Sequence, residues 1–160
     1  MRSGFLVALV SAVMAVAPLQ AIAGDWSRYD NVRFAYAIDI PPDFSEVAEA
    51  ENSDGGVSAS ADGKAELRVW GGYLVDSDFK SEIAGRVQSD TSEGWAISYD
   101  RRTGTNASWS GSKSGRVFYA RSMKGCDDAA IYFRLEYDRA DLDAYHGIVG
   151  RLVKSLHATC

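Results

Sequence analysis

Hydrophobic and polar residues alternate in several segments of the chain. Between residues 32 and 40 every second side chain is bulky and apolar: Phe34, Tyr36, Ile38 and Ile40. Successive side chains of a strand point to opposite faces of a sheet, so this alternation predicts a half-buried strand. Residues 57–60 and 65–70 alternate in the same way and flank the pair Asp62-Gly63. Asp-Gly between two such runs is typical of a tight turn, so these runs predict a hairpin.

A change of period marks the first predicted helix. Downstream of Asp76 and Ser77, apolar side chains recur every four residues until about residue 90: Phe79, Ile83 and Val87. This spacing places them on one face of a helix. Asp76 or Ser77 is the expected N-cap, because either side chain can accept a hydrogen bond from an unpaired first-turn amide. The narrow apolar stripe favours packing on a sheet.

The second half of the chain returns to alternation and then ends in a helical pattern. Short turn-like segments join the runs, and strands joined in this way must be antiparallel because a parallel connection needs about a dozen residues or more. Residues 140–156 are predicted to form a helix with a broad apolar face, and Asp138 or Asp141 is its expected N-cap. The predicted strands cover residues 95–99, 107–111, 116–123 and 129–137.

The order of these elements indicates the fold class. One antiparallel sheet with two amphipathic helices packed on it is an α+β fold of the α/β/α sandwich type. No internal repeat or linker divides residues 24–160, so we expect this segment to fold as a single α+β domain.

The first residues have the pattern of a cleavable secretory signal. One cation, Arg2, precedes an apolar run that ends at Val16, and a small-residue triplet (Ala-Ile-Ala) occupies positions 21–23. The apolar run is shorter than the roughly 20 residues of a transmembrane helix. We therefore interpret residues 1–23 as a signal peptide. The mature domain is expected to begin at Gly24, without a membrane anchor, and to be periplasmic or secreted.

Charge and cysteine content narrow the possible partners and chemistry. Once Arg2 is removed with the signal, 16 basic residues stand against 22 acidic ones, and the net charge of −6 makes nucleic acid an unfavourable partner. The mature segment contains two cysteines, Cys126 and Cys160. Export to an oxidising compartment predicts a disulfide between them. The last helix should run back along the last strand and bring the chain end near the turn before that strand.

Several segments resemble a known family. Residues 29–41, Asp54-Gly55, the Asp62-Gly63 hairpin and residues 65–69 resemble small exported bacterial proteins with a Mog1/PsbP-like α/β/α fold. The resemblance covers residues 29–73, and the predicted helices agree with it through residue 156. It implies this fold and mostly non-enzymatic accessory or binding roles, and it supplies no catalytic residues.

The candidate binding residues are aromatic. Trp70, Trp95 and Trp109 lie in predicted strands and are a possible aromatic binding surface for a sugar or a peptide. Packing in the core or on the sheet is the alternative interpretation. His146 and His157 are the two histidines, and no metal-ligand spacing accompanies them, so we predict neither a metal site nor a cofactor. We assign no catalytic residue.

These observations favour a non-enzymatic function. We expect an exported accessory module that binds an unidentified protein or small molecule. A small exported hydrolase is the alternative, and it would need His146 within hydrogen-bond reach of a serine or an acid. A protein-binding role would instead appear as an exposed apolar patch.

Overall fold

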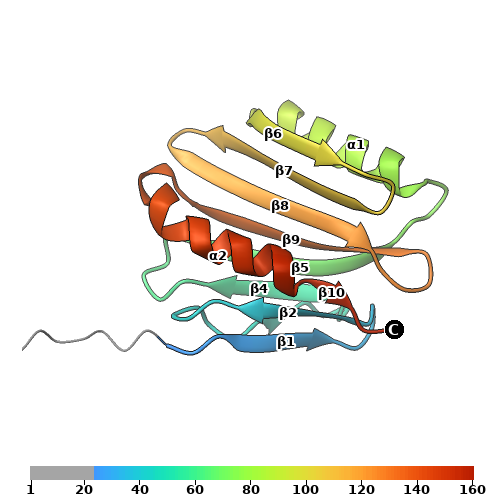
Figure 1. The fold of residues 1–160 in the computed structure, drawn as a ribbon, viewed down its shortest axis with the longest axis horizontal. Helices are drawn as coiled ribbons and strands as arrows, with labels where there is room; N and C mark the ends of the chain where they lie inside the picture. Colours follow the sequence, from blue (N-terminus) through green and yellow to red (C-terminus); the bar gives the residue numbers. More distant parts are fainter. Residues whose placement is uncertain (1–23) are drawn as a thin grey trace, which may run out of the picture.

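The computed structural model describes residues 24–160, and within this range the chain forms two antiparallel sheets and two α-helices. The predicted signal peptide, residues 1–23, lies outside the described residues. The larger sheet has the strand order β3-β4-β5-β9-β8-β7-β6 (Figure 1). Its strands are β3 Ala48–Glu49, β4 Gly55–Ala59, β5 Glu66–Tyr73, β6 Ala96–Arg102, β7 Asn106–Lys113, β8 Arg116–Lys124 and β9 Ala129–Asp138.

Most of these strands are those that the sequence predicts. The Asp62-Gly63 turn joins β4 to β5, with Gly63 at a positive φ of 71° that glycine adopts without strain. In β6 the pairing with β7 shifts register between Ile97 and Tyr99. Beyond this bulge, β6 continues to Arg102, three residues past its predicted end. The antiparallel meander β6-β7-β8-β9 thus forms one half of the sheet.

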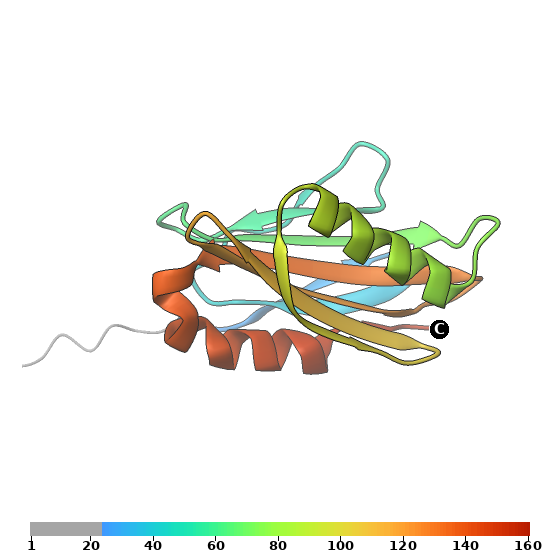
Figure 2. The ribbon, with the colours of Figure 1, turned by 90° about the horizontal axis from the view of Figure 1, so that it is seen from above.

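Helix α1, Phe79–Ser92, covers one face of the larger sheet (Figure 2). Phe79, Ile83 and Val87 are buried against the sheet, as their spacing predicts. The predicted cap is wrong: Asp78 is the N-cap, and its carboxylate accepts a hydrogen bond from the backbone N–H of Ser81 at 2.7 Å. Asp76 cannot serve, because it lies in the connecting turn at φ 55° and the helix begins later.

A second, smaller sheet packs on the opposite face. Strand β1, Ser27–Asn31, pairs with β2, Tyr36–Ile40, and β2 pairs on its other side with β10, His157–Ala158. The predicted strand over residues 32–40 is therefore wrong at its start. Residues 32–35 form a turn in which the Asn31 side chain accepts a hydrogen bond from the backbone N–H of Phe34 at 2.9 Å. Phe34 lies in this turn, and its side chain is buried in the core. The apolar alternation therefore extends into the turn, although the strand does not.

Helix α2, Leu142–Ser155, lies on the same face as the small sheet (Figures 1 and 2). A short 3₁₀ turn, η1 Arg139–Asp141, precedes it, so the regular helix starts after the predicted residue 140. Asp141 occupies the N-cap position without a side-chain hydrogen bond to the helix. The main core lies between this layer and the larger sheet, and its largest fully buried side chains are Tyr36, Ile38, Ile40, Leu67, Ile131, Phe133, Leu135 and Leu152.

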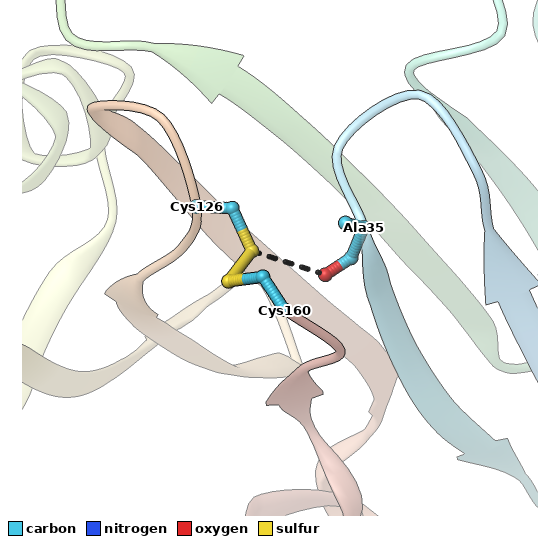
Figure 3. Close-up of a disulfide and its surroundings, with 3 residues drawn as sticks. All are labelled: Ala35, Cys126 and Cys160. Carbon is cyan, nitrogen blue, oxygen red and sulfur yellow. Dashed lines mark hydrogen bonds between the residues drawn. A yellow bond between two sulfur atoms is a disulfide. The ribbon is translucent and has the colours of Figure 1, made fainter.

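The predicted disulfide joins Cys126 and Cys160 (Figure 3). Cys126 lies in the turn before β9, and Cys160 follows β10 at the chain end. The Sγ atom of Cys126 lies 3.7 Å from the carbonyl oxygen of Ala35, in the turn between β1 and β2. The same carbonyl accepts a hydrogen bond from the backbone N–H of Thr159 at 2.8 Å. The disulfide therefore links the C-terminal segment, which follows β10 of the smaller sheet, to the turn before β9 of the larger sheet.

The antiparallel α+β fold is confirmed in its main features. Two helices cover opposite faces of one large antiparallel sheet (Figure 2). The simple α/β/α sandwich is incomplete as a description, because three short strands share a layer with α2. Among residues 24–160, no helix combines the length and apolar character needed to cross a membrane.

A candidate ligand-binding groove beside helix α1

A groove of about 780 Å³ lies between α1 and the sheet face that α1 covers. We call it the α1 groove. Strand alternation forms its floor: in β5, Leu67 and Val69 point into the main core, whereas Arg68 and Trp70 line the groove. In β9, Arg134 and Glu136 line it in the same way. Helix α1 covers only part of this face, and the uncovered remainder is polar, charged and aromatic.

All three tryptophans of the predicted aromatic surface line the α1 groove. Trp70 is half-buried and stacks on Tyr132 with ring centroids 4.9 Å apart and planes 7° from parallel. Trp95 is also half-buried and meets Phe118 edge to face. Trp109 differs, because only 2% of it is exposed and it packs in the core beneath α1. Trp70 and Trp95 keep part of their surface exposed, with the Arg86 guanidinium carbon 5.5 Å from the Trp70 ring centre and the Arg134 guanidinium carbon 5.1 Å from the Trp95 ring centre. Trp109 supports the floor of the groove.

A buried charged network holds the end of α1 against the sheet. The Asp90 carboxylate accepts a hydrogen bond from the indole N–H of Trp109 at 2.7 Å and another from the Arg134 guanidinium at 2.7 Å. Arg134 also donates to Glu136 at 2.7 Å. The Arg134 guanidinium carbon lies 3.7 Å from the centre of the Phe118 ring. Every charge in this network has a partner, as burial of charge requires.

A second set of paired groups forms the wall of the groove nearer the middle of α1. The Arg86 guanidinium donates to Glu82, one helical turn earlier, at 2.8 Å and lies 4.3 Å from the centre of the Tyr132 ring. The Tyr132 hydroxyl donates to the same Glu82 carboxylate at 3.2 Å. Burial raises the pKa of the Tyr132 phenol, so it stays a neutral donor across the physiological range.

The sequence does not single out the charged residues of this groove, although it carries a signal for them. Asp90 follows Val87 by three residues and so falls on the buried stripe of α1, where an acid must find a partner. An acid near a helix C-terminus is also unfavourable against the helix dipole. Both features indicate a specific cation nearby, and Arg134 is that cation. Which cation lies next to Asp90 depends on how the strands pair, and the sequence pattern does not give that pairing.

His146 lies elsewhere, on α2 at the opposite face of the sheet. It is exposed, and among the described residues no hydrogen bond joins it to a serine or an acid. His157 is exposed in β10, and its Nδ1 lies 2.7 Å from the backbone oxygen of Ser155. The constellation that the hydrolase alternative requires is therefore not formed around His146. Within residues 24–160, no three His, Cys, Asp or Glu side chains gather in a metal-binding arrangement.

Comparison with known proteins places the fold. No protein-family model matches the chain, and no curated protein sequence matches it. Two of the solved structures that resemble this chain align with it over most of their length. The yeast (Saccharomyces cerevisiae) Ran-binding protein Mog1p superposes with a TM-score of 0.62 at 11% identity, over 85% of this chain and 96% of that protein. Cyanobacterial PsbP (CyanoP) from Synechocystis sp. PCC 6803 superposes with a TM-score of 0.60 at 14% identity, over 90% and 98%.

The chain has a Mog1/PsbP-like fold. The resemblance seen in residues 29–73 is thus confirmed at the level of the fold, and it extends over most of the described chain. Sequence identities this low establish architecture rather than shared chemistry.

Proposed function

We propose that the mature chain is an exported accessory module that binds a ligand in the α1 groove without transforming it. The observation that carries this proposal is the convergence of Trp70, Trp95 and Trp109 on one cavity of about 780 Å³. Small-molecule sites are concave, usually of about 300–1,000 Å³, and combine aromatic walls with a few placed polar groups. The α1 groove has the size of such a site and three tryptophans in its lining, while most of its other lining residues are polar or charged, which suits a polar ligand.

The charges of the groove favour an uncharged ligand. Three guanidinium groups of the groove are paired: Arg134 with Asp90 and Glu136, Arg86 with Glu82, and Arg68 with Glu66. The Glu93 carboxylate also lines the groove and accepts a hydrogen bond from the Ser89 hydroxyl at 3.3 Å. A charged ligand would have to break these pairs and leave a partner uncompensated, which is costly at a half-buried site. Hydroxyl groups, in contrast, can donate to carboxylates and accept from guanidinium N–H groups that are already paired.

A neutral oligosaccharide is uncharged and rich in hydroxyl groups, so it suits the paired charges of the groove better than a charged peptide does. The apolar face of a sugar ring can lie on a half-buried indole such as Trp70 or Trp95. Its hydroxyls can reach the carboxylates and the hydroxyl of Ser81 or Ser89, which also line the groove. Of the two ligand classes that the aromatic content indicates, we therefore favour a neutral sugar chain over a peptide.

Calorimetric titration tests this function directly. The probes are cellohexaose and chitohexaose as neutral oligosaccharides, with a neutral proline-rich peptide as the alternative class. Binding of an oligosaccharide but not of the peptide is the expected result. Binding of the peptide alone would overturn the sugar assignment, and binding of no probe would count against the α1 groove as a ligand site.

A glycine in α1 offers a matched test of the location. Gly85 lines the groove, and a Cβ built on it meets no atom within 4 Å. Gly85→Phe should fill the groove and abolish binding while leaving the fold intact, because phenylalanine is a better helix residue than glycine. Gly147→Phe is the control: it changes an equally open helix glycine that does not line the groove. Equal loss of binding in both variants would contradict the proposed location.

A protein partner is a second candidate. One solved structure with this fold is described as a Ran-binding protein, so the fold is compatible with binding to a protein. We keep an unidentified protein as the alternative partner.

We also propose that the protein acts in the periplasm or outside the cell after removal of residues 1–23. The disulfide between Cys126 and Cys160 supports this location, because disulfides persist mainly in oxidising compartments. Intact-mass measurement of protein recovered from a cell envelope fraction tests it. We expect a chain that starts at or near Gly24, and a species that retains residues 1–23 would refute the assignment.

A further inference from the structure

A second groove, of about 680 Å³, lies on the opposite face of the larger sheet. We call it the α2 groove. Helix α2 packs over β2 and the main core, and within residues 24–160 no helix or strand covers the same face of β6, β7 and β8. The groove is the space between the free side of α2 and these strands. Tyr99 on β6 is 42% exposed and Leu142 on α2 is 43% exposed, so both walls are open to solvent.

The walls of the α2 groove are mainly apolar and aromatic. Val149 and Val153 line it from α2, and Tyr119 and Tyr137 line it from β8 and β9. Tyr119 stacks between Tyr99 and Phe133, with centroid distances of 6.4 and 6.2 Å. When a hydrocarbon chain binds against apolar walls of this kind, both surfaces are removed from water, and this burial favours binding.

The ionisable side chains that line the α2 groove from α2 and the turn before it are basic. Arg139 lines it at the start of α2, Lys154 lines it near the end, and His146 lies between them. No Asp or Glu of the described part of the chain lines it, although acids outnumber bases in the full sequence, 22 to 17. Within residues 24–160, neither Arg139 nor Lys154 forms an ion pair. Both cations are exposed, so each can pair with an anionic group of a ligand in the groove.

We propose that the α2 groove binds a single-chain amphipathic carboxylate, a ligand of the fatty-acid class. Its hydrocarbon chain would lie along α2 on the valines and tyrosines, and its carboxylate would pair with Lys154 or Arg139. Leu142 and Lys154 are separated by a helical rise of roughly 18 Å, so the groove suits an elongated molecule. This ligand class is the one that matches both an apolar lining and cationic ends. The site is separate from the α1 groove and does not depend on the function proposed there.

Two glycines in α2 provide the test pair. Gly150 lines the α2 groove and Gly147 does not, and a Cβ on either residue meets no atom within 4 Å. Both positions can therefore accept a side chain without a clash. Gly150→Phe places a ring in the groove, whereas Gly147→Phe places one outside it. Both substitutions replace the poorest non-proline helix residue, so neither should unfold α2.

Titration calorimetry with dodecanoate, below its micelle concentration, tests the proposal, with dodecylammonium as the cationic counterpart. We expect dodecanoate to bind the wild-type protein and dodecylammonium to bind at least about tenfold more weakly. Gly150→Phe should weaken dodecanoate binding by about tenfold or more, and Gly147→Phe should leave it unchanged. The ligand carboxylate is expected to pair with one of the two cations. Of Lys154→Glu and Arg139→Glu, the variant that removes this cation should weaken dodecanoate binding more than the other. Lys124→Glu, an exposed charge change in β8 that does not line the groove, is the control.

Three outcomes would overturn the proposal. Equal affinity for dodecanoate and dodecylammonium would show that the cations do not select the ligand. Equal loss of binding in Gly147→Phe and Gly150→Phe would place the site elsewhere. Sedimentation that shows a dimer, converted to a monomer by Gly150→Phe, would assign the groove to a second copy of the chain. Loss of oligosaccharide binding in Gly85→Phe with dodecanoate binding intact would confirm that the two grooves are independent.

Discussion

Replacement of Asp90 by alanine should be among the most destabilising single changes on the α1 side of the sheet. The substitution removes the acceptor of the Trp109 indole N–H and one of the two carboxylates that pair with Arg134. A buried donor left without an acceptor costs about 1–3 kcal/mol. Breaking a buried ion pair costs about 3–5 kcal/mol, and here Glu136 retains part of the compensation. We therefore expect a loss of about 3 kcal/mol in the free energy of unfolding.

Urea denaturation followed by far-UV circular dichroism measures this loss. Asp90→Asn should be milder than Asp90→Ala, because an amide oxygen can still accept from Trp109 although the charge is gone. Asp30→Ala is the matched control: its ion pair with Arg28 is made by side chains that are 58% and 52% exposed, and we expect no measurable change. A double-mutant cycle of Asp90→Ala with Trp109→Phe should show clear coupling. If Asp90→Ala costs no more than Asp30→Ala, the network does not hold α1 and our reasoning is wrong.

Three further predictions concern the disulfide and the effect of pH. Replacing Cys126 and Cys160 by serine opens a loop with a sequence separation of 34 residues, so the free energy of unfolding should fall by about 3–4 kcal/mol in urea titration; an unchanged midpoint would refute this. Hydrogen bonds lower the pKa of Asp62 and Asp78, so their contribution to stability is complete above about pH 4 and is lost as the pH falls through the lowered pKa values. The melting temperature should therefore decline in acid, and less so in Asp78→Asn. Burial raises the pKa of Tyr132, so its contribution persists below about pH 10 and is lost at higher pH, where phenolate absorbance should appear together with unfolding.

The elements with regular periodicity could be predicted from the sequence. The four-residue spacing of Phe79, Ile83 and Val87 locates α1, and the Asp62-Gly63 turn locates the β4–β5 hairpin. Strand β1 could not be found in this way, because Ser27–Asn31 is an edge strand of largely exposed polar residues with no apolar alternation. Strand β10 is two residues long and forms only because β2 lies beside it.

The grooves depend on strand order, which local patterns do not encode. The aromatic content indicates three tryptophans of interest, but Trp70 and Trp109 come together only because β5 pairs with β9 and β8 lies between β9 and β7. The Arg134 partner of Asp90 is 44 residues away along the chain for the same reason. The α2 groove was not predicted, because it arises where α2 leaves part of the sheet uncovered rather than from any motif.

The indole N–H signals of the four tryptophans in a ¹H–¹⁵N spectrum test ligand binding in the α1 groove most directly. Trp70, Trp95 and Trp109 line the groove, whereas Trp26 lies in the layer of β1 and α2, with the Arg151 guanidinium 4.3 Å from its ring centre. On titration with cellohexaose or chitohexaose, we predict that the Trp70 and Trp95 signals shift with saturation and the Trp26 signal stays in place. If neither sugar moves the Trp70 and Trp95 signals, or if Trp26 moves with them to the same extent, the proposed ligand site is contradicted.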